Sequence, residues 1–292
     1  MINGHIEEMG KKAKEASKKL LTLDTRIKNK ALIMIAEELI NKKEEIKEAN
    51  RLDLENGKRE GLSFALLDRL ELTDKRIEAM SQGLMEIAAF TDPIGEILSG
   101  WRHKNGMTIE KKRVPLGVLG IIYESRPNVT VDAAALAIKT GNAIILRGGK
   151  EAYHTSEAMV QIMQSSLERC GAPKELVQLV SILEREAVGE LLAQRKWIDV
   201  MIPRGGAGLI QFVVNNSKIP VIETGSGVVH GYVDASADEM MALQVLENAK
   251  LSRPSVCNAM ETILLHEARL HDLGPKIVSM LKEKGVTIYG DD

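Results

Sequence analysis

The 292-residue chain has 44% hydrophobic residues, which is ample for a large buried core and favours two domains over one. Its 39 basic and 41 acidic residues give a formal net charge of −2, so no global field attracts nucleic acid or an anionic membrane. Two cysteines argue against a disulfide framework, and no uncharged apolar stretch is as long as a membrane span. The first eight residues lack a signal-peptide pattern. We therefore expect a cytoplasmic enzyme whose partners are small molecules or copies of itself.

The first ninety residues are expected to be helical. Apolar positions return at helical spacing within 4–58, which predicts one or two long amphipathic helices, the second of them capped at Thr25. A third helix is expected from about residue 73 to residue 89. Asn105-Gly106 then stands between two alternating segments and predicts a hairpin with a type I′ turn. The hairpin, residues 99–113, is either an arm for assembly or plain surface.

Strand-type and helix-type segments alternate from residue 114. Strands are expected at 114–122, 141–147, 177–182 and 198–202, each followed by a helix. Repeated βα units imply a parallel, doubly wound, Rossmann-like sheet whose ligands bind at the carboxyl ends of the strands. After residue 221, shorter strands at 221–222, 228–233 and 261–265 and two helices predict a second, smaller α/β domain.

Two glycine-rich loops follow predicted strands. Arg204, Gly205 and Gly206 open a helix, where backbone N–H groups favour a pyrophosphate, although a plain strand-to-helix turn has the same pattern. Arg147 and Lys150 flank two glycines at the end of another strand and suit a phosphate, although basic loop ends are ordinarily solvated. The coincidence of the two loops at one sheet edge favours a nucleotide site.

Two further loops carry polar residues beside predicted strands. Glu223 ends a short apolar strand before Gly225 and suits either a general base or a surface carboxylate. In Tyr123-Glu-Ser-Arg-Pro-Asn128, Arg126 and Asn128 suit an anionic substrate or an oxyanion, with a solvated loop as the alternative. The six histidines and two cysteines show no spacing typical of a metal site, so we expect no metal.

Cys257 lies in a turn-rich segment, Arg253-Pro-Ser-Val-Cys-Asn-Ala259. A thiol reacts as the thiolate, which requires exposure and nearby positive charge or free N–H groups, and Arg253 and Asn258 offer such surroundings. Free cysteine is also a frequent core residue. The local sequence therefore leaves both readings of Cys257 open.

Together these segments resemble the aldehyde dehydrogenase superfamily, and within it the glutamate-5-semialdehyde dehydrogenase subfamily. The resemblance spans the chain, and its most specific parts are Tyr-Glu-Ser-Arg-Pro-Asn, ending at Asn128, and Arg-Pro-x-x-Cys-Asn-Ala, ending at Ala259. Three more segments match, at 139–152, 202–206 and 222–225. The resemblance makes Cys257 the nucleophile.

The implied reaction is NADPH-dependent reduction of L-glutamyl 5-phosphate to L-glutamate 5-semialdehyde with release of phosphate, the second step of proline biosynthesis from glutamate. It proceeds through a thioester on Cys257, with the Cys257 backbone N–H and Asn128 near the oxyanion and Glu223 in the site with its role open. Lys150 falls where NAD-preferring members often have a glutamate, so NADP(H) is expected. The implied cofactor-binding residues are Arg147, Lys150, Arg204, Gly205, Gly206, Thr224 and Gly225, and the implied substrate-binding residues are Glu124, Ser125, Arg126 and Asn258.

The resemblance also implies an organisation. Residues 1–98 and 114–220 are expected to form the NADP-binding domain, 99–113 an oligomerisation arm, and 221–292 a catalytic domain that is incomplete, because family members continue further. A homo-oligomer and a glutamate 5-kinase partner are expected. Two alternatives stay open: another aldehyde or acyl dehydrogenase of the superfamily, or a truncated NADPH-binding chain without catalysis.

Overall fold

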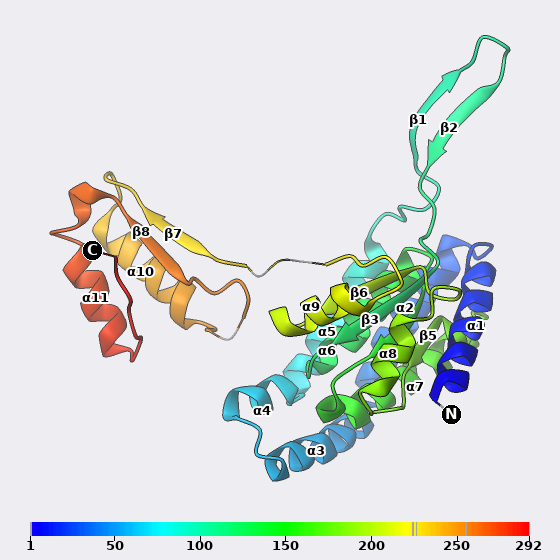
Figure 1. The fold of residues 1–292 in the computed structure, drawn as a ribbon, viewed down its shortest axis with the longest axis horizontal. Coiled ribbons are helices and arrows are strands. Elements are labelled where there is room, and N and C mark those ends of the chain that lie inside the picture. The colour runs from blue at the N-terminus through cyan, green and yellow to red at the C-terminus, as the bar shows by residue number, and fades with distance from the viewer. Residues whose placement is uncertain (1, 224, 226, 255, 292) are drawn as a thin grey trace. The chain divides into compact units, whose positions relative to one another are not determined.

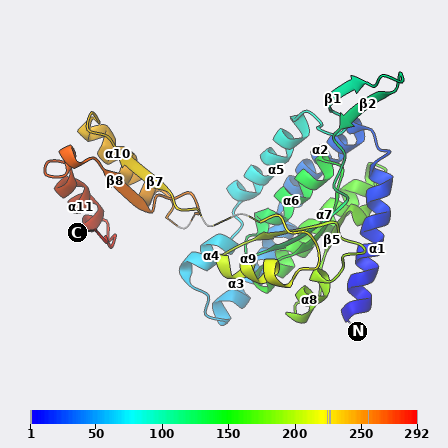
Figure 2. The ribbon, with the colours of Figure 1, turned by 45° about the horizontal axis from the view of Figure 1, so that its top comes forward.

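The computed structural model describes residues 2–223, 225, 227–254 and 256–291. The chain divides into two compact units, Met1–Thr224 (unit 1) and Gly225–Asp292 (unit 2). Figures 1 and 2 label their helices and strands.

A parallel sheet forms the centre of unit 1, with the strand order β5-β4-β3-β6. All six residues of the central strand β3 are buried, because it pairs on both edges and helices cover both faces. The strand predicted at 221–222 is only a single bridge, from Val221 to Met201 of β6. The strands are β3 (Val118–Tyr123), β4 (Ala143–Arg147), β5 (Val177–Leu179) and β6 (Val200–Arg204).

Helices cover both faces of this sheet, as a doubly wound fold requires. On one face, α6 and α7 connect successive strands, and α2, α3 and α5 pack outside them. On the other face, α1 packs on the strands beside α8, and α8 contacts α9. Their bounds are α1 (Ile2–Leu20), α2 (Thr25–Asn41), α3 (Lys43–Arg59), α4 (Phe64–Leu70), α5 (Asp74–Ala89), α6 (Pro127–Lys139), α7 (Tyr153–Arg169), α8 (Glu186–Leu192) and α9 (Ala207–Asn216), with short 3₁₀ turns η1 (Lys150–Ala152) and η2 (Lys174–Leu176).

The N-terminal segment differs from the prediction in its helix boundaries. Three helices, α1 to α3, take the place of the one or two expected within 4–58. The N-cap of α2 is Asp24 and not Thr25, because the Asp24 carboxylate accepts the Arg26 N–H at 2.8 Å. The Thr25 hydroxyl instead donates to Asp92 at 2.6 Å and so links the start of α2 to the root of the hairpin.

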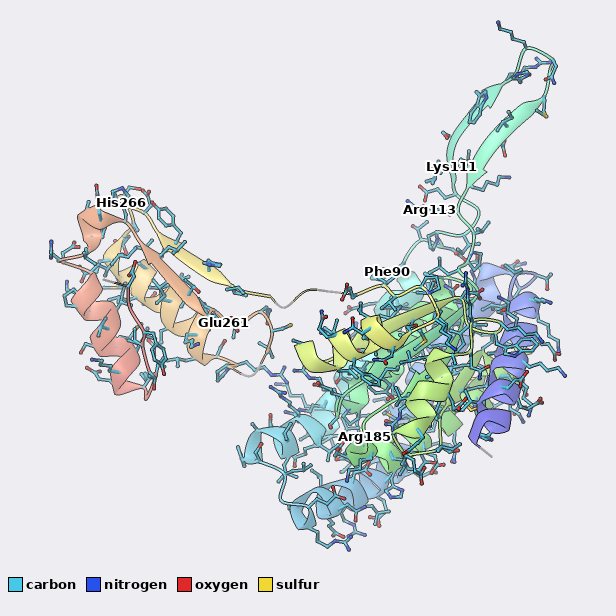
Figure 3. The ribbon with its side chains drawn as sticks, viewed as in Figure 1. Phe90, Lys111, Arg113, Arg185, Glu261 and His266 are labelled. Atoms are coloured by element: carbon cyan, nitrogen blue, oxygen red, sulfur yellow. The ribbon has the colours of Figure 1, made fainter. Side chains whose placement is uncertain are left out.

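The predicted hairpin consists of β1 (Ile97–Arg102) and β2 (Thr108–Lys112), which pair antiparallel and project from the body of unit 1 (Figure 1). The predicted type I′ turn is wrong, because φ is positive at Gly106 (+90°) but not at Asn105. Gly106 N–H donates to the His103 carbonyl oxygen, which closes a type I turn followed by a left-handed glycine. The side chains point outward along both strands, and Lys111 marks β2 in Figure 3.

A buried polar node joins α3 to α7. The Asp53 carboxylate, on α3, accepts the His154 and Thr155 N–H groups at 3.2 and 2.8 Å and the Thr155 hydroxyl at 2.6 Å. Burial raises the pKa of Asp53, and these hydrogen bonds oppose that shift. Asn50, one turn earlier, reaches Leu70 and Leu72 at the end of α4. The node therefore fixes the first turn of α7 against α3.

Unit 2 is a small α/β unit. Its strands β7 (His230–Val233) and β8 (Thr262–Leu265) pair in parallel, and Glu261 and His266 mark the two ends of β8 in Figure 3. The helices are α10 (Glu239–Leu251), α11 (Gly274–Glu283) and the 3₁₀ turn η3 (Glu267–Arg269). Its core is formed by Val233, Leu246, Met260, Leu273, Ile277 and Leu281.

Replacement of Asp53 by alanine should lower the free energy of unfolding of unit 1 by about 2–4 kcal/mol, because it leaves buried N–H and O–H donors without an acceptor. Both tryptophans, Trp101 and Trp197, lie in unit 1, so tryptophan fluorescence during urea unfolding reports on this unit. Glu55 is exposed on the same helix, and Glu55→Ala should change the free energy of unfolding by less than about 0.5 kcal/mol. Equal effects of the two variants would contradict the role of the node.

Candidate nucleotide site and candidate nucleophile

The carboxyl ends of β3, β4 and β6 meet at one edge of the sheet. The pairing register places Ile122 beside Arg147 on one side of β3 and Tyr123 beside Arg204 on the other. The chain passes from β3 through β4 to β5 and then crosses to the far side of β3 to form β6. The strand order therefore reverses between β3 and β6, the position at which doubly wound sheets bind ligands.

Glu124 bridges this switch point. Its Oε1 accepts the Gly206 N–H at 2.7 Å, at the N-terminal end of α9. Gly205 allows this approach, because a Cβ there would lie 2.7 Å from Glu124 Oε1 and 2.8 Å from its Cγ and Cδ. A carboxylate thus lies where α9 offers backbone N–H groups to an anion. The substrate-binding role predicted for Glu124 remains a prediction, and its geometry links it to the glycine loop predicted to bind the pyrophosphate.

Side-chain contacts hold the rest of the loop after β3. Ser125 donates to Glu151 at 3.0 Å, and Arg126 is the N-cap residue of α6. The exposed Asn128 amide donates to Asp132, one turn further along α6, at 3.0 Å. Burial raises the pKa of Asp132, and the Asn128 bond opposes that shift. Use of Asn128 on an oxyanion would require its amide to leave Asp132.

The Arg147 side chain is buried, at 8% exposure, and its contacts are to backbone. One guanidinium nitrogen donates to the Leu183 carbonyl oxygen at 2.8 Å and another to the Gly148 carbonyl oxygen. Burial lowers the pKa of Arg147, and its Nε has no hydrogen-bond partner within the described part of the chain. Arg147 therefore links the loop after β4 to the loop after β5.

Lys150 lies at the rim of a cavity of about 430 Å³ beyond the end of β4. Its Nζ donates to Glu60 Oε2 at 2.7 Å, and this carboxylate raises the pKa of Lys150. The other polar residues that line the cavity were not predicted from the sequence, and they are Asn56, Arg59, Glu60, Glu151, Tyr153 and His154. No local motif marks them, because Glu60 and Lys150 are 90 positions apart in the sequence.

Residues 223–225, where unit 1 ends and unit 2 begins, include a predicted catalytic residue, Glu223, and two predicted cofactor-binding residues, Thr224 and Gly225. Glu223 is exposed at the end of unit 1. Thr224 lies outside the described residues, and Gly225 is an exposed residue of unit 2. The predicted roles of all three remain predictions.

The candidate nucleophile lies in unit 2, in the loop between α10 and β8. Cys257 and Asn258 are exposed, whereas Ala259 and Met260 directly after them are buried. Ala259 N–H donates to the Val256 carbonyl oxygen at 3.2 Å, which places Cys257 in a turn. A Cβ added at Gly227 would lie 3.2 Å from the Cys257 carbonyl oxygen, so a glycine suits this close passage of two backbones.

In the residues that the structure describes, no group of three or more His, Cys, Asp or Glu side chains is arranged to hold a metal ion. The helices among them include none with the length and apolar character needed to cross a membrane.

A sequence profile of the aldehyde dehydrogenase family matches residues 3–287. The chain is 52% identical over 285 residues to a gamma-glutamyl phosphate reductase of Moorella thermoacetica, a match that covers 98% of this chain and 68% of that protein. It is also similar to two crystal structures of gamma-glutamyl phosphate reductases. The one from Thermotoga maritima has a TM-score of 0.88 and 43% identity, over 96% of this chain and 68% of that one, and the one from Saccharomyces cerevisiae has 0.69 and 34%, over 98% and 71%. The predicted resemblance and the aldehyde dehydrogenase-like α/β fold are confirmed.

Cys257 should react with a thiol reagent at pH 7.5 at least about tenfold faster than Cys170, because Cys257 is exposed. Cys170 is half-buried at the end of α7, burial raises its pKa, and its thiol contacts Met34 Sδ at 3.7 Å. The time course of labelling with 5,5′-dithiobis(2-nitrobenzoate), compared between Cys257→Ser and Cys170→Ser variants, assigns each phase. A fast phase that survives in Cys257→Ser would contradict this order of reactivity.

Proposed function

We propose that this chain, which belongs to the aldehyde dehydrogenase family, reduces L-glutamyl 5-phosphate with NADPH to L-glutamate 5-semialdehyde and phosphate. The observation that carries the proposal is the exposed Cys257 turn, in a chain 52% identical to a named gamma-glutamyl phosphate reductase. The reaction is the second step of proline biosynthesis from glutamate. The match covers 68% of that relative, and the steps proposed below use only residues of this chain.

The sheet edge of unit 1 fits a dinucleotide. The N-terminal end of α9, with Gly205 and Gly206, suits the pyrophosphate, because backbone N–H groups and the helix dipole favour an anion. The cavity beyond β4 suits the adenosine end, and Lys150 at its rim suits a 2′-phosphate. When bound, NADPH supplies the hydride that reduces the acyl group.

Cys257 carries the substrate chemistry in this proposal. Its thiolate attacks the C5 acyl carbon, the C–O bond to phosphate breaks, and phosphate leaves with the electron pair, which forms a thioester. We assign the Cys257 backbone N–H and Asn128 to the developing oxyanion, and Arg126, Asn258, Glu124 and Ser125 to the substrate. After reduction the C–S bond breaks, the aldehyde is released and the thiolate is restored. Glu223 stays in the site without an assigned step, because the reaction activates no water.

We also propose that the chain forms a homo-oligomer through its hairpin. The hairpin exposes Ile97, Leu98, Trp101 and Met107, and an exposed apolar hairpin supports an interface with another copy of the chain. We further propose that the chain acts in the cytoplasm. The labile acyl phosphate also points to a glutamate 5-kinase as the partner that supplies it.

The reverse reaction tests this function. The chain should reduce NADP⁺ in the presence of glutamate 5-semialdehyde only when phosphate is added, and Cys257→Ser should lower the rate at least about a thousandfold, because the nucleophile is lost. Absorbance at 340 nm measures the rate, and Cys170→Ser is the matched control. Turnover without phosphate would favour another aldehyde dehydrogenase activity. Nucleotide binding without turnover would favour the non-catalytic alternative.

NADPH should bind at least about tenfold more tightly than NADH, because Lys150 attracts the 2′-phosphate. Lys150→Gln should remove most of this difference by weakening NADPH binding. Isothermal titration of the full chain measures both dissociation constants. Lys174→Gln is the matched control, since Lys174 forms a similar exposed ion pair, with Glu168, away from the cavity. Equal affinity of the unmodified chain for the two nucleotides would contradict the NADP(H) preference.

A further inference from the structure

The cavity beyond β4 brings together charged side chains from separate elements of unit 1. Arg59 and Glu60 come from the end of α3, Lys150 and Glu151 from η1, and His154 from the first turn of α7. The buried Asp53 node fixes α7 against α3, so these elements hold a defined distance across the cavity. The charged rim is therefore built by tertiary packing and not by one flexible loop.

The charges at this rim balance one another. Arg59 and Lys150 are positive and Glu60 and Glu151 are negative. Lys150 is held by Glu60 across the cavity, Glu151 accepts from Ser125, and the Arg59 guanidinium donates to Asn56 on its own helix. The C-terminal end of α3 adds partial negative charge from its last carbonyl groups. A phosphate is therefore attracted to this rim only when it replaces a carboxylate as the partner of a cation, as Glu60 is for Lys150.

The Lys150–Glu60 pair is suited to such an exchange. Both side chains are about half exposed, and ion pairs of that kind contribute little to stability. A phosphate dianion carries more charge than a carboxylate and accepts several hydrogen bonds. It therefore competes well for the Lys150 ammonium, whereas a nucleotide that ends in a ribose hydroxyl leaves the pair intact.

We propose that Arg59 and Glu60 are specificity-determining residues for the 2′-phosphate of the nucleotide. Arg59 supplies a second cation beside Lys150, and Glu60 is the resident counter-charge that the 2′-phosphate displaces. The proposal rests on the nucleotide site of the proposed function and assigns two residues outside the strand-end motifs. In this proposal the preference for NADPH depends on competition between the 2′-phosphate and the Glu60 carboxylate for the Lys150 ammonium group.

Two charge-removing variants of the full chain test the proposal with NADPH and NADH as probes. Glu60→Gln should tighten NADPH binding roughly threefold to tenfold and leave NADH binding within about twofold, because one competing negative charge is removed. Arg59→Gln should weaken NADPH binding by a similar factor and also leave NADH binding within about twofold. Glu55→Gln and Lys58→Gln on the same helix, which do not line the cavity, should change neither constant by more than about twofold.

The possible results separate this inference from the proposed function. Unchanged NADPH affinity in Glu60→Gln and Arg59→Gln, with a native circular dichroism spectrum, would overturn the inference alone. Equal changes for NADPH and NADH would also overturn it, because the residues would then act on a shared part of the nucleotide. Weaker NADPH binding in Glu60→Gln would mean that Glu60 orients Lys150 and does not compete. An unmodified chain that binds neither nucleotide would contradict the proposed function, and the inference with it.

Discussion

The whole of unit 1 depends on how the central strand β3 is held. Gly120 in the middle of this strand leaves room for Met201, because a Cβ there would lie 2.3 Å from the Met201 sulfur. Before the strand, Gly117 has a φ of +119° and lies against Asp199, whose carboxylate accepts two hydrogen bonds from Lys14. Because β3 is fixed at its start and paired on both edges, its register with β4 and β6 is set. That register places three loops together at the carboxyl edge, so the candidate site follows from the packing of β3.

At this edge two of the protein's own carboxylates pair with groups that the proposed function assigns to phosphates. Glu124 accepts from the first turn of α9, and Glu60 accepts from Lys150. These internal pairs give the Gly206 N–H and the Lys150 ammonium group a hydrogen-bond partner. They therefore reduce the free-energy cost of placing several donors close together. The affinity for an anionic ligand is then the difference between its interactions and those of the carboxylate it displaces. Selectivity can arise from the carboxylates as well as from the cations.

The sequence predicted the features that depend on neighbouring residues and missed those that depend on packing between distant ones. Alternating strands and helices from residue 114 sufficed for the parallel sheet, because buried strands and amphipathic helices have clear local patterns. The turn at Asn105 was predicted wrongly, because its side-chain oxygen accepts the Met107 N–H at 3.1 Å and stabilises a type I turn instead. Likewise, the strand-end loops were visible in the sequence, but Glu60 was not. Its position opposite Lys150 depends on how α3 packs on α7.

The backbone next to the exposed Cys257 thiol is anchored to the body of unit 2. Three residues after Cys257, Met260 is buried and its N–H donates to the Ala249 carbonyl oxygen at 3.0 Å, which ties the loop to the end of α10. Two further N–H groups, of Glu261 and Thr262, donate to the Val229 carbonyl oxygen, ahead of β7. These anchors are backbone hydrogen bonds, and the Cys257 side chain takes no part in them. These bonds fix the backbone on the C-terminal side of the candidate nucleophile, while the Cys257 side chain itself stays open to solvent.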